Sequence, residues 1–214
     1  VDLVWRLNRA GWRIRFDPSV EAEHREPETW SKLLNRRFRY GTSAAPLSKR
    51  HPGAVAPLVL HLWPTLVVLS LLAKRPALAA TLFVGQLAAL RSRLSAADIP
   101  NENLVGPSAT GVYETWRGIG HYCTQFASPA LAAAIVLPRA KRSHTRRIAA
   151  APLLVGPALA KYFEARPKID PARFVAIRIA DDVAYGTGVW LGCIQQRTLA
   201  PLKPRLIPTL KRND

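Results

Sequence analysis

Methionine is absent from the sequence, and only two of its 214 residues are cysteines, Cys123 and Cys193. Two cysteines without a Cys-x-x-Cys pair argue against a disulfide framework and against a structural zinc site. We interpret both as small buried residues in a reducing compartment. The first twenty residues lack the apolar stretch of a secretory signal peptide. Because the chain does not begin with methionine, we expect it to be part of a longer protein.

Acidic residues are also scarce, with 14 Asp and Glu against 31 Lys and Arg, a formal net charge of +17, although 49% of all residues are hydrophobic. A nucleic-acid-binding protein would account for the charge but not for the long apolar runs. The basic residues are also spread along the chain without interleaved aromatic residues, so we expect no nucleic-acid partner. A protein at a membrane surface accounts for both features, and we expect anionic membrane lipid as a partner.

Charged residues are missing altogether from residues 52–73, a length that reaches the roughly 20 residues needed to cross a bilayer, and the Leu, Val, Ala and Trp content of this run predicts a membrane helix. Residues 77–90 are a second uncharged run, and we expect the two runs to form a helical hairpin. Residues 119–138 are weakly hydrophobic and precede a basic cluster, which three complete spans would place outside the cell, against the positive-inside rule. We therefore expect re-entrant or interfacial segments at 119–138 and 148–160. The alternative is a helical bundle with an unusually apolar core.

The N-terminal region shows short elements with clear periodicity. Leu3, Val4 and Leu7 have helical spacing, and Gly11 follows as a left-handed C-terminal residue. Strict alternation in residues 12–16 predicts a strand with one buried face, and residues 20–24 a possible second strand. A further helix is expected from residues 26–28, with proline in its first turn, to Gly41.

These patterns predict a mainly α chain with four parts: residues 1–50, a hydrophobic hairpin at 51–94, a linker rich in Ser, Gly, Pro and Asn at 95–118, and a membrane-associated helical region at 119–214.

The first residues carry a family resemblance. Val1 to Leu7 resembles the latter half of the motif (E)D-x-D-L-x-x-R-L at the end of the catalytic domain of inverting family-2 glycosyltransferases. The resemblance implies that residues 1–50 are the end of a GT-A α/β catalytic domain. It also implies that the general base is the acidic residue just before Val1, outside this chain, and that Asp2 is the second catalytic-motif acid. The alternative is that Asp2 only stabilises the N-terminus of a helix.

Two further motifs extend the resemblance. His24 lies near the position of the V-x-H pattern, which implies contact with a metal-bound diphosphate, although a surface histidine is the alternative. Arg36, Arg39 and Tyr40 resemble the Q-x-x-R-W motif of membrane-bound family-2 synthases, which implies substrate binding at the acceptor side. An aromatic ring can stack on a sugar, and Arg can hold a diphosphate with two hydrogen bonds. The alternative is a basic juxtamembrane helix.

Two longer blocks, residues 39–53 and 170–193, resemble the glycosyltransferases of the mycofactocin system over their C-terminal half. The resemblance implies transfer of a sugar, expected to be glucose, from a nucleotide sugar to mycofactocin, a peptide-derived redox cofactor. It further implies Mg or Mn, bound with the donor mainly by an upstream domain, and a location at the cytoplasmic face of the cell membrane. The competing hypothesis is a basic membrane-anchored scaffold without catalysis.

Asp181 and Asp182 are adjacent acids on a predicted helix, and adjacent side chains point about 100° apart. We therefore expect no shared metal ion but an ion pair with Arg178. The small residues that follow, Gly186, Gly188 and Gly192 beside Tyr185, predict close packing between helices.

If the base and the donor site lie upstream, the isolated 214-residue chain should not transfer sugar from a nucleotide sugar. The same chain extended upstream should do so. Radiolabelled sugar transfer by both proteins measures the difference, and transfer by the isolated chain would contradict the prediction.

Overall fold

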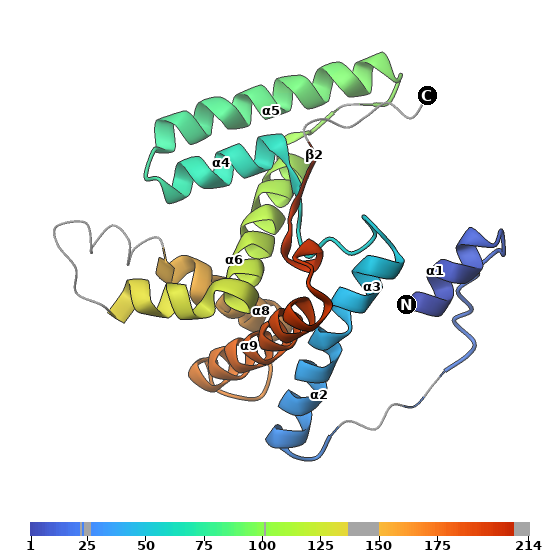
Figure 1. Ribbon diagram of the computed structural model, residues 1–214. Helices are drawn as coiled ribbons and strands as arrows, with labels where there is room; N and C mark the ends of the chain where they lie inside the picture. The colour runs from blue at the N-terminus through green and yellow to red at the C-terminus, as the bar shows by residue number, and fades with distance from the viewer. Residues whose placement is uncertain (22, 24–26, 101, 137–149, 208–214) are drawn as a thin grey trace.

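The computed structural model describes residues 1–21, 23, 27–100, 102–136 and 150–207, and the prediction of a mainly helical chain is confirmed there (Figure 1). A pair of parallel strands joins the start of the hairpin to the C-terminal tail, with Leu60 opposite Leu206. The elements are α1 (Asp2–Arg9), α2 (Trp30–Thr42), α3 (Ala44–Arg50), β1 (Val59–His61), α4 (Leu62–Leu72), α5 (Pro76–Ala96), α6 (Val105–Val136), α8 (Gly156–Ala165), α9 (Pro171–Gln196), the 3-10 helix η1 (Ala200–Leu202) and β2 (Arg205–Ile207).

Helix α9 lies at the centre and packs against α2, α6 and α8 (Figure 1). Its small residues let backbones touch, as predicted. A side chain at Gly188 would overlap the carbonyl oxygen of Phe38 in α2, and one at Gly186 would overlap that of Gln125 in α6. Gly41 was expected to end α2, but α2 continues to Thr42 because Gly41 is instead a contact point with α9.

The hydrophobic hairpin is present as α4 and α5, which lie across one end of α6 (Figure 1). The prediction of one membrane helix over residues 52–73 is wrong, because α4 has only 11 residues and the segment before it forms β1. Pro64 explains the late start, since proline is tolerated in the first turn of a helix but not in its interior. Among the described residues, no helix is both long enough and apolar enough to span a bilayer.

The segment predicted as a linker, 95–118, is mostly helical: it contains the end of α5 and the first part of α6, and residues 97–100 and 102–104 lie between these helices. The re-entrant or interfacial segment expected at 119–138 stays a prediction; its residues 119–136 belong to α6, and residues 137–138 lie outside the described residues. Glycines and prolines suggested a linker because they disfavour helices in isolation. Packing outweighs that preference here. In the segment predicted as a linker, for example, Ser108 is only 3% exposed because α6 packs against the α4–α5 hairpin. The other segment expected at the interface, 148–160, contains the start of α8 and lies outside the described residues at 148–149.

The N-terminal helix is confirmed as α1, and Gly11 follows it with φ of +82°. The strand expected at residues 12–16 is absent, because the segment pairs with no other strand among the described residues; the Trp12 amide donates instead to the Leu7 carbonyl at the end of α1. Its apolar side chains are consequently uncovered, with Trp12 67% and Phe16 86% exposed. Helix α2 begins later than expected, after Thr29, whose hydroxyl accepts a hydrogen bond from the Lys32 amide.

The contact of α9 with α6 predicts a contrast between two helix glycines. Gly186→Ala should lower the free energy of unfolding by about 1–3 kcal/mol, because a methyl group collides with backbone that cannot rotate away. Gly111→Ala is the control, since nothing lies within 4 Å of the added methyl group, and it should raise that free energy by up to about 1 kcal/mol. Urea denaturation measures both, and equal effects would contradict the packing.

Candidate functional site

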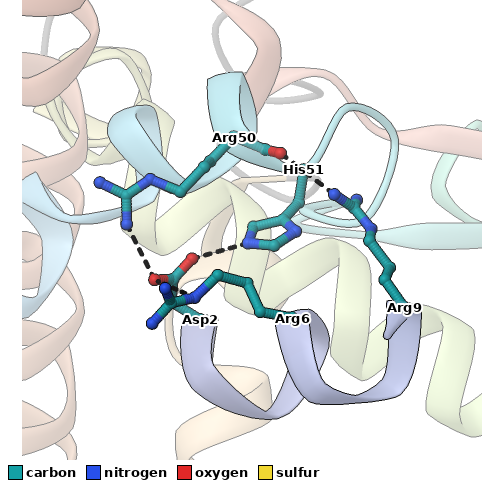
Figure 2. Close-up of polar contacts among 5 residues, drawn as sticks. All are labelled: Asp2, Arg6, Arg9, Arg50 and His51. Carbon is teal, nitrogen blue, oxygen red and sulfur yellow. Dashed lines mark hydrogen bonds and ion pairs between the residues drawn. The ribbon is translucent and has the colours of Figure 1, made fainter. Parts of the chain in front are cut away.

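Asp2, the first residue of α1, contacts the residues at the end of α3 (Figure 2). Its Oδ1 accepts a hydrogen bond from His51 Nε2 at 2.7 Å, and its Oδ2 accepts one from Arg50 Nη1 at 2.8 Å. Arg6, one turn along α1, lies 3.4 Å from Oδ2. The C-terminal end of α1 is also bound to this region, since Arg9 donates a hydrogen bond to the Arg50 carbonyl oxygen at 3.3 Å. Asp2 therefore ties α1 to the helical body.

His51 is the buried part of this connection, with 1% of the residue exposed. The edge of its ring meets Trp5 with ring centroids 4.9 Å apart. Because a carboxylate only accepts hydrogen bonds, Nε2 carries a proton, while Nδ1 is buried with no partner among the described residues. The His51 hydrogen bond and the neighbouring Arg50 hold the pKa of Asp2 below its ordinary value of 3.8, although desolvation opposes this.

Beside this connection lies a cleft of about 510 Å³ between α1, α2, α6 and α9. The segment after His51 closes one side. Aromatic rings and polar groups share the lining: Trp5, Arg37, His121, Gln125, Phe126 and Tyr185, together with Ala44, Ala54, Val55, Ala56, Pro57, Val189 and Pro201. This combination suits a ligand that has both apolar faces and many hydroxyl groups, such as a sugar.

An ion pair and a hydrogen-bonded histidine build the polar wall of the cleft. Arg37 Nε lies 2.6 Å from Asp181 Oδ1, and its guanidinium lies over the Tyr185 ring at 5.4 Å from the centroid. Behind it, His121 Nδ1 lies 3.1 Å from Asp182 Oδ2. The Gln125 amide donates to His121 Nε2 at 2.8 Å, so the ring proton is on Nδ1 and points to Asp182.

Asp182 is 5% exposed, and His121 and Gln125 supply its polar contacts. The expected ion pair of the two acids with Arg178 is therefore wrong, because Asp181 turns toward α2 and Asp182 toward α6. The prediction that adjacent acids point apart is confirmed. His121 and Asp182 also line a second, smaller cavity of about 300 Å³ between α6, α8 and α9, so His121 faces both openings.

The site residues expected from sequence are only partly brought together. None of Asp2, Arg36, Arg39 and Tyr40 lines the cleft, and Tyr40 is 50% exposed. Asp2 is next to the cleft only through His51, whose ring meets the lining residue Trp5. His24 lies outside the described residues. Arg37 was missed, although its position four residues before Gly41 puts it on the face of α2 that meets α9.

His51, His121 and Gln125 were missed as well. His51 had a signal, because it belongs to a sequence block that carried the family resemblance. His121 and Gln125 had none, since they meet Asp182 only through the packing of α6 on α9.

A metal does not fit the described part of the chain, where no group of three or more His, Cys, Asp or Glu side chains could hold one. Asp2 is already bound by a histidine and an arginine. A metal bound with a nucleotide sugar would therefore need ligands from elsewhere.

Comparison with known proteins gives one consistent result. The chain is 30% identical to the pre-mycofactocin glycosyltransferases of Mycobacterium tuberculosis strains CDC 1551 / Oshkosh and ATCC 25618 / H37Rv, over 219 aligned positions that cover 96% of this chain and 45% of each relative. The chain thus spans about half the length of these curated relatives. No protein-family model and no solved structure matches it.

The Asp2 connection predicts a specific acid sensitivity. Because the folded-state pKa of Asp2 is lowered, its stabilising contribution is complete above about pH 4 and is lost as the pH falls through the lowered value. Asp2→Asn should therefore lower the thermal midpoint at pH 6 but not below the folded-state pKa of Asp2.

Thermal unfolding of both proteins between pH 2 and pH 6 measures this difference. Glu21→Gln, a change at an exposed acid in the same region, is the control and should leave the midpoint unaltered throughout. A gap between Asp2→Asn and the parent that persists at low pH would show that the carboxylate charge is not what holds α1.

Proposed function

We propose that the chain is the acceptor-side part of an inverting, family-2-type glycosyltransferase that transfers glucose from a nucleotide sugar to mycofactocin. The observation that carries the proposal is the similarity, over 96% of the chain, to proteins named as pre-mycofactocin glycosyltransferases. That similarity favours an enzyme over the competing scaffold hypothesis. The cleft next to Asp2 adds physical support, since it offers rings for stacking and polar groups for hydroxyls.

In the proposed reaction the acceptor hydroxyl oxygen attacks the anomeric carbon, the bond from that carbon to the diphosphate oxygen breaks, and the hydroxyl proton passes to a carboxylate base. The nucleotide diphosphate leaves from the opposite face. This base lies outside the chain in our proposal, as do the donor site and the Mg or Mn that binds with the donor. Both Asp2 oxygens already accept hydrogen bonds, which supports a positioning role for Asp2 over direct contact with substrate.

The uncovered N-terminal segment fits this proposal. Residues 12–16 alternate like a strand but form no regular element, and their side chains Trp12, Ile14 and Phe16 are at least half exposed. A strand with these properties needs a neighbouring strand and an apolar layer to cover it. We assign that cover to the remainder of a GT-A domain, with the connection through His51 and Asp2 holding that domain against the cleft.

The proposed location is the cytoplasmic face of the cell membrane, with anionic lipid as a further partner. The excess of Lys and Arg over Asp and Glu, 31 to 14, supports it, since basic surfaces are attracted to anionic leaflets.

The cleft predicts a selective effect on the acceptor. In the protein extended to the length of its relatives, Gln125→Ala should raise the acceptor KM about tenfold, which is the cost of roughly one buried hydrogen bond. The donor KM should stay within about twofold. Gln195→Ala, at an exposed position on α9, is the control.

Initial rates of sugar transfer at varied acceptor and varied donor concentrations separate the two constants. An unchanged acceptor KM for Gln125→Ala, in a protein with normal thermal stability, would remove the cleft from the proposal. A raised donor KM would instead place the donor there.

A further inference from the structure

We propose that the groove between the α4–α5 hairpin and α6 binds an acyl chain of an anionic membrane lipid, and that Lys74 and Arg75 bind the phosphate of its headgroup. The inference rests on the proposed membrane location of the enzyme and specifies its lipid partner. Its test, however, measures lipid binding alone and needs no sugar transfer.

The groove has a volume of about 650 Å³, which lies within the usual range of ligand sites. Its lining is almost entirely aliphatic and aromatic, with few polar atoms to favour water or a polar ligand. It consists of Val67, Val68, Leu71 and Leu72 of α4, Pro76, Ala79, Ala80 and Phe83 of α5, and Ala109, Val112, Tyr113 and Trp116 of α6.

The apolar surface continues beyond the groove onto the outside of the hairpin. Leu69 and Leu71 are 50% and 52% exposed, and Leu78 and Val84 are 44% and 64% exposed. No charged residue occurs in α4 or in α5 before Arg91. A helix that is apolar on all sides requires cover, and most surface helices have a polar outer face.

The positive charges next to the groove indicate which kind of ligand covers this apolar surface. Lys74 and Arg75 form the turn between α4 and α5, both are exposed, and they lie between the groove residues Leu72 and Pro76. The turn is fixed by hydrogen bonds of 2.9 Å from the Lys74 amide to the Leu71 carbonyl and from the Arg75 amide to that of Ser70. The backbone that carries these two cations is thus fixed beside an apolar groove.

No acidic residue opposes these cations nearby in sequence, since residues 29–97 contain neither Asp nor Glu. An anionic lipid complements both features of the site, because its phosphate meets the lysine and arginine while its chain enters the groove. A second copy of the same basic chain would instead bring like charges together at the turn.

Tryptophan fluorescence with vesicles provides the test, since Trp116 lines the groove. Phosphatidylglycerol vesicles with brominated acyl chains should quench the 214-residue chain, whereas brominated phosphatidylcholine vesicles should not. Trp116→Phe should lose a clear share of the quenching, and Trp190→Phe, which removes an exposed ring on α9, should keep it. Ala80→Phe, which fills the groove, should reduce quenching of Trp116, and Ala77→Phe, an exposed position outside the lining, should not.

The headgroup contact is tested by charge reversal at the two ends of α5. Lys74→Glu with Arg75→Glu should weaken sedimentation with phosphatidylglycerol vesicles by at least about tenfold. Arg91→Glu with Arg93→Glu makes the same change in net charge away from the groove and should weaken it by less than about threefold.

Vesicle binding without Trp116-specific quenching would overturn the groove assignment. Equal effects of the two charge reversals, or equal binding to phosphatidylcholine, would overturn the headgroup assignment. A groove covered by self-association, detected as a dimer whose Trp116 is shielded from brominated lipid, would also contradict the proposal. None of these outcomes bears on sugar transfer, which the acceptor kinetics test separately.

Discussion

Backbone contact between α9 and its neighbours determines how α2 and α6 are placed and which side chains meet in the cleft. At Gly186 and Gly188 the main chain of α9 touches the carbonyl groups of Gln125 in α6 and Phe38 in α2, where no side chain would fit. This approach brings Arg37 within reach of Asp181 and His121 within reach of Asp182. The polar wall of the cleft therefore depends on the glycines of α9, which lie one to two turns after Asp181 and Asp182 and let α2 and α6 come close.

The two polar centres of the molecule have different roles in this account. Asp2 and His51 join the first helix to the body, so they determine where a domain attached to that helix would lie. The Arg37, His121 and Gln125 cluster faces the cleft and can contact a ligand there. In the proposed enzyme the first centre positions the catalytic carboxylate, and the second orients the acceptor toward it.

Sequence reasoning predicted features that depend on local patterns. Apolar spacing gave α1, the uncharged runs gave the α4–α5 hairpin, and the small residues of α9 gave its close packing. It could not identify the cleft, because Arg37, Gln125 and Tyr185 come from three helices distant in sequence. It also took residues 105–118 for a linker, since the helix there depends on tertiary contacts that outweigh the low helix propensity of glycine.

In the proposed enzyme the cleft beside Asp2 receives the acceptor. The most direct test is photo-crosslinking with a mycofactocin acceptor that carries a diazirine, followed by mass spectrometry of the labelled peptides from the extended protein. Labels are expected in the segments around Arg37, at residues 54–57, and around Gln125 and Tyr185, and unlabelled acceptor should compete with all of them. Competed labels confined to other parts of the protein would contradict this placement of the acceptor.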